Sequence, residues 1–249
     1  MRILIPLAGS SKEFEEQGYN YPKHLIEIAG KPIIQHVIER INTFPESEYI
    51  FIIQNVESER FHLENVLKLL IPDCKVITLS GMTQGAACSA LCAIEQINDD
   101  QPLLIYNGDI IIEHNLEKIV QDFQSRDLDG GIVTFNSVHP RWSYVRLDNN
   151  NMVIEAAEKR PISKQATAGI YYYKKGKDFV QSAKNMIKKN AQIGGLFYIC
   201  PAYNEMILKQ AKIGIYEISR DKYFSLSTHQ EVTSYSQYYE EKQKRILTE

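Results

Sequence analysis

Apolar residues in the first part of the chain alternate between largely apolar runs and stretches with helical spacing. The largely apolar runs predict strands over residues 2–6, 49–54, 75–79 and 102–107. Apolar positions with helical spacing predict three helices, over residues 32–41, 57–70 and 86–96. Strands that alternate with helices favour parallel pairing through crossover connections. The pattern therefore predicts an α/β fold with a doubly wound, mainly parallel sheet flanked by helices.

The pattern changes in the second part of the chain. A helix is predicted from Asn115 to about Arg126, and short runs separated by turn residues such as Asp148–Asn151 follow it. These runs predict strands over residues 131–137, 143–147, 152–157 and 167–173. We expect them to form a mixed-sheet extension, with a terminal helix over 236–249. No stretch has the composition of a linker, so residues 1–249 are expected to form one domain with halves 1–115 and 116–249.

A loop of 25 residues, 7–31, separates the first predicted strand from the first predicted helix. A loop of this length without structure of its own is uncommon in a compact domain and is usually functional. The loop begins at the carboxyl end of a strand, and so does the turn Asn107-Gly108-Asp109. Ligands of doubly wound sheets bind outside these strand ends. The loop and the turn are therefore the first candidates for ligand contacts.

Two parts of this loop have chemistry that suits a phosphate. The small residues Leu7–Ser11 let backbone amides approach a phosphate closely, although a plain tight turn explains these five residues equally well. Lys23 follows Pro22, whose ring fixes the backbone, and its ammonium can meet triphosphate oxygens as a point charge. The loop is therefore a candidate phosphate site.

Composition and charge narrow the partners. The chain is 44% hydrophobic and 24% charged, as in folded soluble proteins, and its formal net charge is −3. Any phosphate site must therefore be local, and nucleic acid is not an expected partner. The apolar start, residues 1–6, is too short for a signal peptide or a membrane span, so we expect a cytoplasmic protein without membrane insertion. Neither the four cysteines nor the six histidines have metal-site spacing.

Six segments of the chain match motifs of one protein family in one order. They are 18–32, 83–91, 102–109, 155–161 with 168–171, 197–205 and 227–231. The run 18–32 resembles the end of the signature AGxGxRFxxxGYxxPKPLIEVxGKP, and the whole series resembles the sugar-nucleotide nucleotidylyltransferases, or sugar-phosphate pyrophosphorylases, of the capsular and surface-polysaccharide type. Each segment is a weak match by itself, but six of them in one order argue against chance. The resemblance implies a nucleotidyltransferase fold of the GT-A-like, Rossmann-like kind.

The resemblance also implies a site for an NTP, Mg²⁺ and a phosphorylated acceptor. The NTP would lie over the first half of the chain and the acceptor over the second half. The residues implied for the nucleotide are Leu7, Ala8, Gly9, Ser10, Lys12, Lys23, Gln84, Gly85 and Asp109. Those implied for the acceptor are Asn107, Glu158, Lys159 and Gly169. The catalytic residues would be Lys23, Asp109 and Lys159, with Asp109 as the metal ligand, although Asp109 taken alone is equally compatible with a turn.

Three positions depart from the family pattern. Its arginine position falls on Glu13, where a carboxylate would repel a triphosphate, and Lys12 is a candidate substitute. Its second metal carboxylate falls on Ser225, with Asp221 as the nearest replacement. A further expected acid falls on Leu196, which suggests a less hydroxylated or non-sugar acceptor.

These departures leave three functions open. The favoured one is NMP transfer from an NTP to a sugar 1-phosphate or similar acceptor, with pyrophosphate release, for a surface polysaccharide precursor. The second is a catalytically weak binding protein that acts as a regulatory or partner subunit. The third, a glycosyltransferase, depends on the DxD sequence Asp127–Asp129, which follows a predicted helix instead of ending a strand. The sequence does not distinguish the base, the acceptor or the oligomeric state, including a homo-oligomer.

Overall fold

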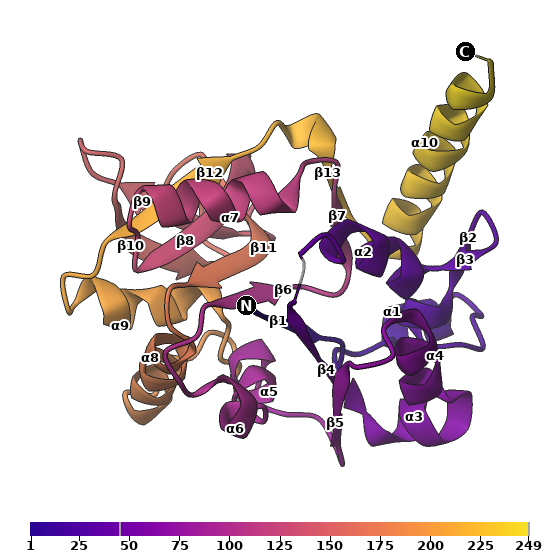
Figure 1. The fold of residues 1–249 in the computed structure, drawn as a ribbon, viewed down its shortest axis with the longest axis horizontal. Coiled ribbons are helices and arrows are strands. Elements are labelled where there is room, and N and C mark those ends of the chain that lie inside the picture. Colours follow the sequence, from indigo (N-terminus) through magenta and orange to yellow (C-terminus); the bar gives the residue numbers. More distant parts are fainter. Residues whose placement is uncertain (45, 249) are drawn as a thin grey trace.

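A computed structural model describes residues 1–44 and 46–248 of the chain (Figure 1). A nine-stranded mixed sheet extends through both halves, and its main path has the strand order β10-β9-β11-β6-β1-β4-β5. Two further strands complete it, because β8 pairs with β11 and β12 pairs with β8. The predicted α/β architecture is confirmed.

The first half of the sheet is parallel. Its strands are β1 (Arg2–Pro6), β4 (Glu48–Gln54), β5 (Lys75–Leu79) and β6 (Leu103–Tyr106). β1 pairs with β4 on one side and with β6 on the other, and β4 pairs with β5, all in parallel. These are the four strands that the largely apolar runs predict. Their carboxyl ends therefore lie along one edge, as expected for a doubly wound sheet.

The second half of the sheet is mixed, as predicted. Its strands are β8 (Gly130–Asn136), β9 (Ser143–Leu147), β10 (Val153–Glu158), β11 (Gln165–Tyr173) and β12 (Ile213–Glu217). β11 is the junction, because it runs antiparallel to β6, β8 and β9. β12, which the sequence pattern did not predict, pairs with β8 in parallel.

Helices cover both faces of the sheet and bury two apolar cores. Side chains alternate along a strand, so Ile3 and Ile5 of β1 face one core and Leu4 faces the other. The first core lies against α2 (Ile33–Ile41), α4 (Leu63–Leu70) and α7 (Leu116–Ser125). The second lies against α5 (Ala86–Leu91), α6 (Ile94–Ile97), α8 (Gly176–Lys188) and α9 (Tyr203–Ile207). The sequence pattern did not predict α8 or α9.

Two predicted helices are broken in the structure. The expected helix 57–70 consists of α3 (Asn55–Phe61) and α4, because His62 between them has a left-handed φ of 56°. The expected helix 86–96 consists of α5 and α6, which are separated at residues 92–93. The terminal helix α10 (His229–Thr248) starts before the predicted residue 236 and projects from the body of the molecule (Figure 1). Apolar spacing continues across such breaks, so the pattern cannot reveal them.

The loop 7–31 contains short elements of its own, which corrects the expectation of an unstructured loop. They are α1 (Lys12–Glu16), the 3-10 turn η1 (Lys23–Leu25), and the hairpin of β2 (Glu27–Ile28) with β3 (Lys31–Pro32). Two further 3-10 turns are η2 (Cys200–Ala202) and η3 (Arg220–Lys222). A separate antiparallel ribbon pairs β7 (Ile110–Ile112) with β13 (Tyr223–Ser225). None of the described helices is long and apolar enough to cross a membrane.

Candidate active site

Two cavities meet at the carboxyl ends of β1 and β6. We name them after the ligands that the sequence resemblance implies: the larger one, of about 480 Å³, is called the acceptor cavity, and the smaller one, of about 360 Å³, the nucleotide cavity. The residues that line both are Ala86, Asn107, Asp109 and Tyr198. The turn after β6 therefore stands between the two cavities, at the strand edge where the topology predicts a ligand site.

An ion pair between Lys23 and Asp109 lies at this junction. The Lys23 Nζ atom is 2.8 Å from Oδ2 of Asp109, although η1 and the turn after β6 are far apart in sequence. Burial alone would raise the pKa of the Asp109 carboxyl, but the ammonium of Lys23 outweighs it and the pKa is lowered. Asp109 is therefore ionised at neutral pH, as a metal ligand must be.

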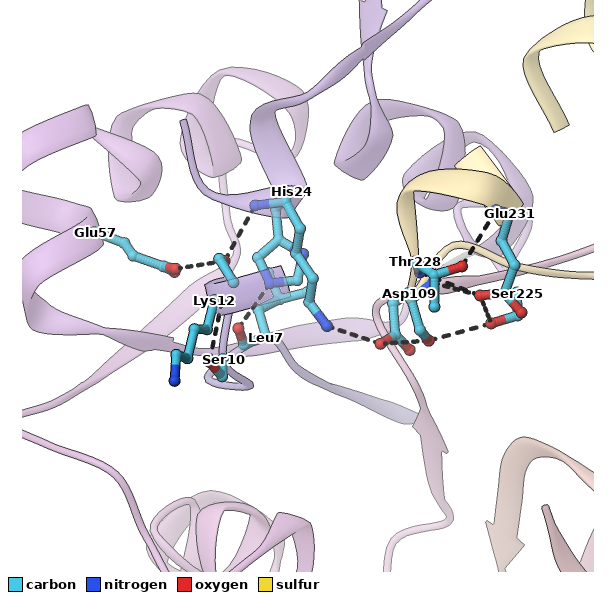
Figure 2. Close-up of polar contacts among 12 residues, drawn as sticks. Leu7, Ser10, Lys12, His24, Glu57, Asp109, Ser225, Thr228 and Glu231 are labelled. Carbon is cyan, nitrogen blue, oxygen red and sulfur yellow. Dashed lines mark hydrogen bonds and ion pairs between the residues drawn. The ribbon is translucent and has the colours of Figure 1, made fainter. Parts of the chain in front are cut away.

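The backbone of the loop is held by two side chains that the signature does not contain. Ser11 occupies the position of the signature's second glycine, and its Oγ accepts a hydrogen bond from the Lys23 N–H at 3.1 Å. His24 Nε2 lies 2.7 Å from the carbonyl oxygen of Leu7 (Figure 2). Burial lowers the pKa of His24 to about 3, so the ring is neutral and donates its N–H to Leu7. These bonds fix Lys23 beside Gly9 and Asp109.

The nucleotide cavity includes most of the loop residues predicted for the nucleotide. Ala8, Gly9, Ser10, Lys23 and Asp109 line it. Leu7 does not, since it is buried and binds His24 through its carbonyl. The cavity also includes three hydroxyl-bearing side chains besides that of Ser10, namely Thr83, Ser89 and Tyr198, which the motif analysis did not select.

Gly85 lines the nucleotide cavity at a position that only glycine can occupy. Its φ is +106°, and a Cβ placed there would lie 2.5 Å from the carbonyl oxygen of Phe197. Gln84, which was predicted beside the base, has an exposed side chain and does not line either cavity. Its carbonyl instead accepts the N–H of Phe197 at 2.8 Å. The segment 83–85 therefore contributes Thr83 and Gly85 to the cavity.

Glu13 and Lys12 lie outside both cavities. Each is exposed on the short helix α1, and Lys12 lies 3.6 Å from Glu16 in an i,i+4 ion pair. The position of Glu13 therefore does not support the expected repulsion of a triphosphate. The position of Lys12 likewise does not support its role as a substitute for the missing arginine.

The four residues predicted for the acceptor all line the acceptor cavity. Lys159 has a left-handed φ of 52°, and its Nζ donates to the hydroxyl of Tyr198 at 2.9 Å. Glu158 accepts a hydrogen bond from Ser143, and its burial raises the pKa of the carboxyl. Gly169 has φ +75°, and a Cβ there would lie 2.6 Å from Nδ2 of Asn107. The left-handed backbone of Lys159 is strained, and Gly169 has no room for a Cβ atom. Such strained positions are typical of functional sites.

Sequence analysis missed a hydrogen-bond network beside Asp109. Ser227 Oγ donates to Oδ2 of Asp109 at 3.2 Å, and Ser225 Oγ donates to Oε2 of Glu231 at 2.8 Å (Figure 2). The same Glu231 oxygen accepts the N–H of Thr228 at 3.2 Å, while Thr228 Oγ1 accepts the N–H of Glu231 at 3.2 Å. This is a capping box, and the spacing Thr-x-x-Glu could have revealed it.

Arg141 is the second cation of the acceptor cavity. Its guanidinium carbon lies 4.0 Å from the ring centroid of Trp142, and its Nη2 pairs with Glu231. Arg141 and Lys159 both line the cavity, so an anionic ligand would meet two positive side chains there. No motif marks Arg141 in the sequence, because its place depends on α10 returning to the strand edge.

Leu196, which departs from the family pattern, and Asp221, the candidate replacement for an acid at Ser225, do not lie in the acceptor cavity. Leu196 lines the nucleotide cavity and not the acceptor cavity, so it gives no information about the hydroxyls of the acceptor. Asp221 has an exposed side chain on η3, bonded to Ser219, and it lines neither cavity. Ser225 is buried on β13 and lines the acceptor cavity. The carboxylate that Ser225 contacts is that of Glu231.

The DxD sequence has a structural role in a turn. Asp127 pairs with Lys174 at 2.5 Å, and Asp129 accepts the N–H of Lys212 at 2.8 Å. Both lie between α7 and β8, and neither lines either cavity.

The oxygen donors near Asp109 suit Mg²⁺. The Asp109 carboxylate and the hydroxyl of Ser227 are hard ligands of the kind that Mg²⁺ prefers. Within the described residues, no group of three or more His, Cys, Asp or Glu side chains could hold a metal by itself. Mg²⁺ often takes one or two carboxylates and completes its shell with water and substrate phosphates, so the residues present fit this ion.

Curated proteins with similar sequences share part of their length with this chain. The bifunctional protein GlmU of Methanocaldococcus jannaschii is 29% identical over 178 residues, which are 70% of this chain and 40% of that protein. The GlmU of Methanococcus aeolicus is 30% identical over 177 residues, again 70% of this chain and 40% of that protein. The chain thus spans 40% of the length of these relatives.

Solved structures share the fold. A nucleoside-diphosphate-sugar pyrophosphorylase of Vibrio cholerae has a TM-score of 0.82 at 24% identity, covering 94% of this chain and 99% of its own. A UDP-glucose pyrophosphorylase complexed with UDP-glucose has a TM-score of 0.78 at 17% identity, covering 97% and 98%. The nucleotidyl transferase family as a whole matches residues 8–213. Since that match covers well over half of the chain and includes most of the residues that line the two cavities, the chain belongs to the nucleotidyl transferase family.

Proposed function

We propose that the protein transfers NMP from an NTP to a sugar 1-phosphate or similar phosphorylated acceptor and releases pyrophosphate. The observation that carries this proposal is that two cavities meet at one partly buried ion pair, Lys23 with Asp109. An NTP in one cavity and an acceptor in the other would bring their phosphates together at this pair. The names of the similar proteins, which include two pyrophosphorylases of nucleotide sugars, support the same reaction.

The nucleotide is proposed to bind over residues 1–115. The base and ribose would lie in the nucleotide cavity beside Gly85, where the backbone permits close approach. Lys23 would bind phosphate oxygens, since its Nζ is already at the junction of the cavities. Mg²⁺, when bound at Asp109, supplies charge neutralisation for the transferring phosphate. The association of Lys23 with Asp109 would then give way to contacts between Lys23 and phosphate.

The acceptor is proposed to bind over residues 116–249, together with Asn107. Lys159 and Arg141 would hold its phosphate and orient it for attack on the α-phosphate of the NTP. Glu158, half-buried and hydrogen-bonded to Ser143, would accept hydrogen bonds from hydroxyl groups of the acceptor. Such a displacement needs alignment and charge neutralisation and requires no covalent catalyst.

The biological setting is part of the proposal. A nucleotide-activated sugar or similar alcohol is the precursor that polysaccharide synthesis uses, and we propose that the product serves a capsular or surface polysaccharide. The reaction would take place in the cytoplasm, where NTPs and sugar phosphates are available. The curated relatives are named GlmU and not glucose pyrophosphorylases, so the sugar of the acceptor is proposed only as a class and not as glucose.

A panel of substrates tests the proposal. Each of the common NTPs is incubated with Mg²⁺ and each of several sugar 1-phosphates, and pyrophosphate release is followed. We expect release only when a matching NTP and acceptor are both present. Nucleotide binding by calorimetry without release across the whole panel would contradict transfer, and would support the alternative of a regulatory or partner subunit. The absence of a second acid at Ser225 is the observation that favours this alternative.

A further inference from the structure

A third cavity, of about 310 Å³, continues the nucleotide cavity around the loop. We call it the rear cavity. Gly9, Ser10 and Met82 line both cavities, so the two are contiguous across the loop. The wall opposite the loop is the helix α3, which contributes Glu57 and Arg60. A ligand that fills the nucleotide cavity and extends past Ser10 would enter the rear cavity.

Glu57 is a buried acid in the wall of this cavity, and one of its carboxyl oxygens has no partner among the described residues. Only 8% of its surface is exposed, and its Oε1 lies 3.4 Å from the hydroxyl of Ser11. Its Oε2 is buried and has no hydrogen-bond partner among the described residues. The carboxyl group points toward the loop 7–31, where its Oε1 meets the hydroxyl of Ser11 (Figure 2). A buried polar atom without a partner is costly to leave unpaired, so a ligand that supplies one is favoured.

Arg60 is a cation that is available to a ligand of the rear cavity. It lies three residues after Glu57, so both side chains occupy one face of α3. Its guanidinium carbon is 5.0 Å from the ring centroid of Phe61, and within the described part of the chain it forms no ion pair. Lys12, the other candidate cation, is 77% exposed, pairs with Glu16 and does not line the rear cavity.

We propose that the rear cavity binds the terminal phosphates of the NTP, with Arg60 as their counter-ion and Glu57, in its protonated form, as a hydrogen-bond donor to them. This inference rests on the proposed function. In this proposal Arg60 of α3 takes the role of the loop arginine of the family, whose position is occupied by Glu13 in this chain. The ligand class is a triphosphate or the released pyrophosphate, whereas an NMP would leave the rear cavity empty.

The charges around Glu57 indicate how binding responds to pH. Burial raises the pKa of Glu57 to about 7, against the opposing effects of the Ser11 hydroxyl and Lys23, while Glu15 adds to the rise. Arg60 faces the same cavity from α3, and the phenols of Tyr19 and Tyr21 face it from the loop. A phosphate beside Glu57 raises its pKa further, because like charges repel. Triphosphate binding near pH 7 should therefore take up a proton.

Calorimetry with phosphate chains of different length tests the role of Arg60. The ligands are an NTP, the matching NMP and inorganic pyrophosphate, and the variants are Arg60→Gln, Lys12→Gln and, as a remote control of equal charge change, Arg146→Gln. We expect Arg60→Gln to weaken NTP and pyrophosphate binding about tenfold or more, since a charge-assisted contact is lost, and to change NMP binding less than about twofold. Arg146→Gln should change none of the three.

Two results would overturn the inference without touching the proposed function. One is an unchanged preference for NTP over NMP in Arg60→Gln. The other is loss of that preference in Lys12→Gln instead. The opposite outcome is also informative. If Arg60→Gln weakens NTP and pyrophosphate binding as expected, but the wild-type protein releases no pyrophosphate with any acceptor, the rear subsite stands and transfer is refuted. A wild-type protein that binds no nucleotide would refute both.

The protonated state of Glu57 has its own test. NTP binding is measured by calorimetry at pH 7 in two buffers of different ionisation enthalpy, which gives the number of protons taken up. We expect proton uptake on NTP binding in the wild type and no uptake from this site in Glu57→Gln. Because the amide of glutamine imitates the neutral acid, the variant should bind NTP at pH 7 with the affinity that the wild type has at pH 6. Equal proton uptake in the two proteins would overturn the role given to Glu57.

Discussion

At the scale of single residues, the site depends on how burial and neighbouring charges set protonation. Lys23 keeps Asp109 ionised at the junction of the cavities, and burial keeps His24 neutral so that it can donate to Leu7. Glu57, only 8% exposed and without a cation in contact, shifts in the opposite direction from Asp109. Two acids near one loop therefore differ in their degree of protonation at neutral pH, since Asp109 is ionised and Glu57 is partly protonated, and each suits a different role.

Replacing the carboxylate of Asp109 should abolish metal-dependent transfer. Asp109→Asn keeps the shape and the contact with Ser227 but removes the charge that a cation needs. We expect pyrophosphate release to fall on the order of 10²-fold or more, while far-ultraviolet circular dichroism shows a retained fold. Asp127→Asn, in the DxD turn, is the matched control and should leave release unchanged. Normal release by Asp109→Asn would show that another carboxylate binds the metal.

Glu57 should make stability depend on pH. Its pKa is about 7 in the folded protein and near 4.5 in the unfolded chain, so the folded state binds more protons between these values. The wild type should therefore lose stability as pH rises from about 4.5 to above 7. Glu57→Gln should lack this loss and be more stable at pH 8 by about 1–2 kcal/mol, after allowance for partial solvation. Urea unfolding at pH 4.5 and 8 measures it, and a constant difference between the proteins would contradict it.

Gly85 should tolerate no side chain. In Gly85→Ala, the φ of +106° and the 2.5 Å approach to Phe197 both oppose a Cβ, and we expect a loss of about 1–3 kcal/mol. Gly81→Ala is the control, because nothing lies within 4 Å of a Cβ at that position. Urea unfolding compares the two. Equal stabilities would show that the segment 83–85 can move away from Phe197.

At the scale of elements, the site is completed by pieces that come from far along the chain. The ribbon of β7 with β13 places Ser225 opposite Ile110, next to Asp109. The first turn of α10 then contributes Glu231, which joins the capping box to Arg141. A short ribbon of three residues in each strand has no periodic signal of its own, so its partner could not be predicted from the sequence. Thr228 and Glu231 did have a recognisable spacing.

Substitutions at Glu231 should distinguish its role in capping α10 from its role in holding Arg141. Glutamine is also a capping-box residue, so Glu231→Gln should change stability little, while Glu231→Ala should lose about 1 kcal/mol. Both variants lose the charge that holds Arg141, so both should raise the KM for the acceptor. Thermal unfolding and acceptor kinetics are the measurements. A raised KM in the alanine variant alone would mean that helix capping, and not the charge, positions Arg141.

At the scale of the whole molecule, apolar runs predict the sheet better than helical spacing predicts the helices. The strands 2–6, 49–54, 75–79 and 102–107 are all present. Three of them are central parallel strands, which need nearly continuous apolar runs, while 75–79 is an edge strand in which Lys75 and Thr78 are exposed. The break at His62 could not be predicted, since one left-handed residue leaves the apolar spacing unchanged. For the site, the motif order placed Lys23, Asp109, Glu158 and Lys159 beside two adjoining cavities. Arg141 and Arg60 lie outside the motifs, and Ser227 lies in a motif segment to which no role was assigned, so only the fold shows their places at the site.

The central claim is that the two cavities bring an NTP and a phosphorylated acceptor together at Lys23 and Asp109. The most direct measurement is ³¹P NMR of the wild-type protein with Mg²⁺, an NTP that binds and a sugar 1-phosphate. The account predicts that the acceptor signal is replaced by a nucleoside diphosphate ester while inorganic pyrophosphate appears in equal amount. It also predicts that Lys23→Met slows both changes together. An unchanged spectrum with bound nucleotide, or release of inorganic phosphate without the diphosphate ester, would contradict it.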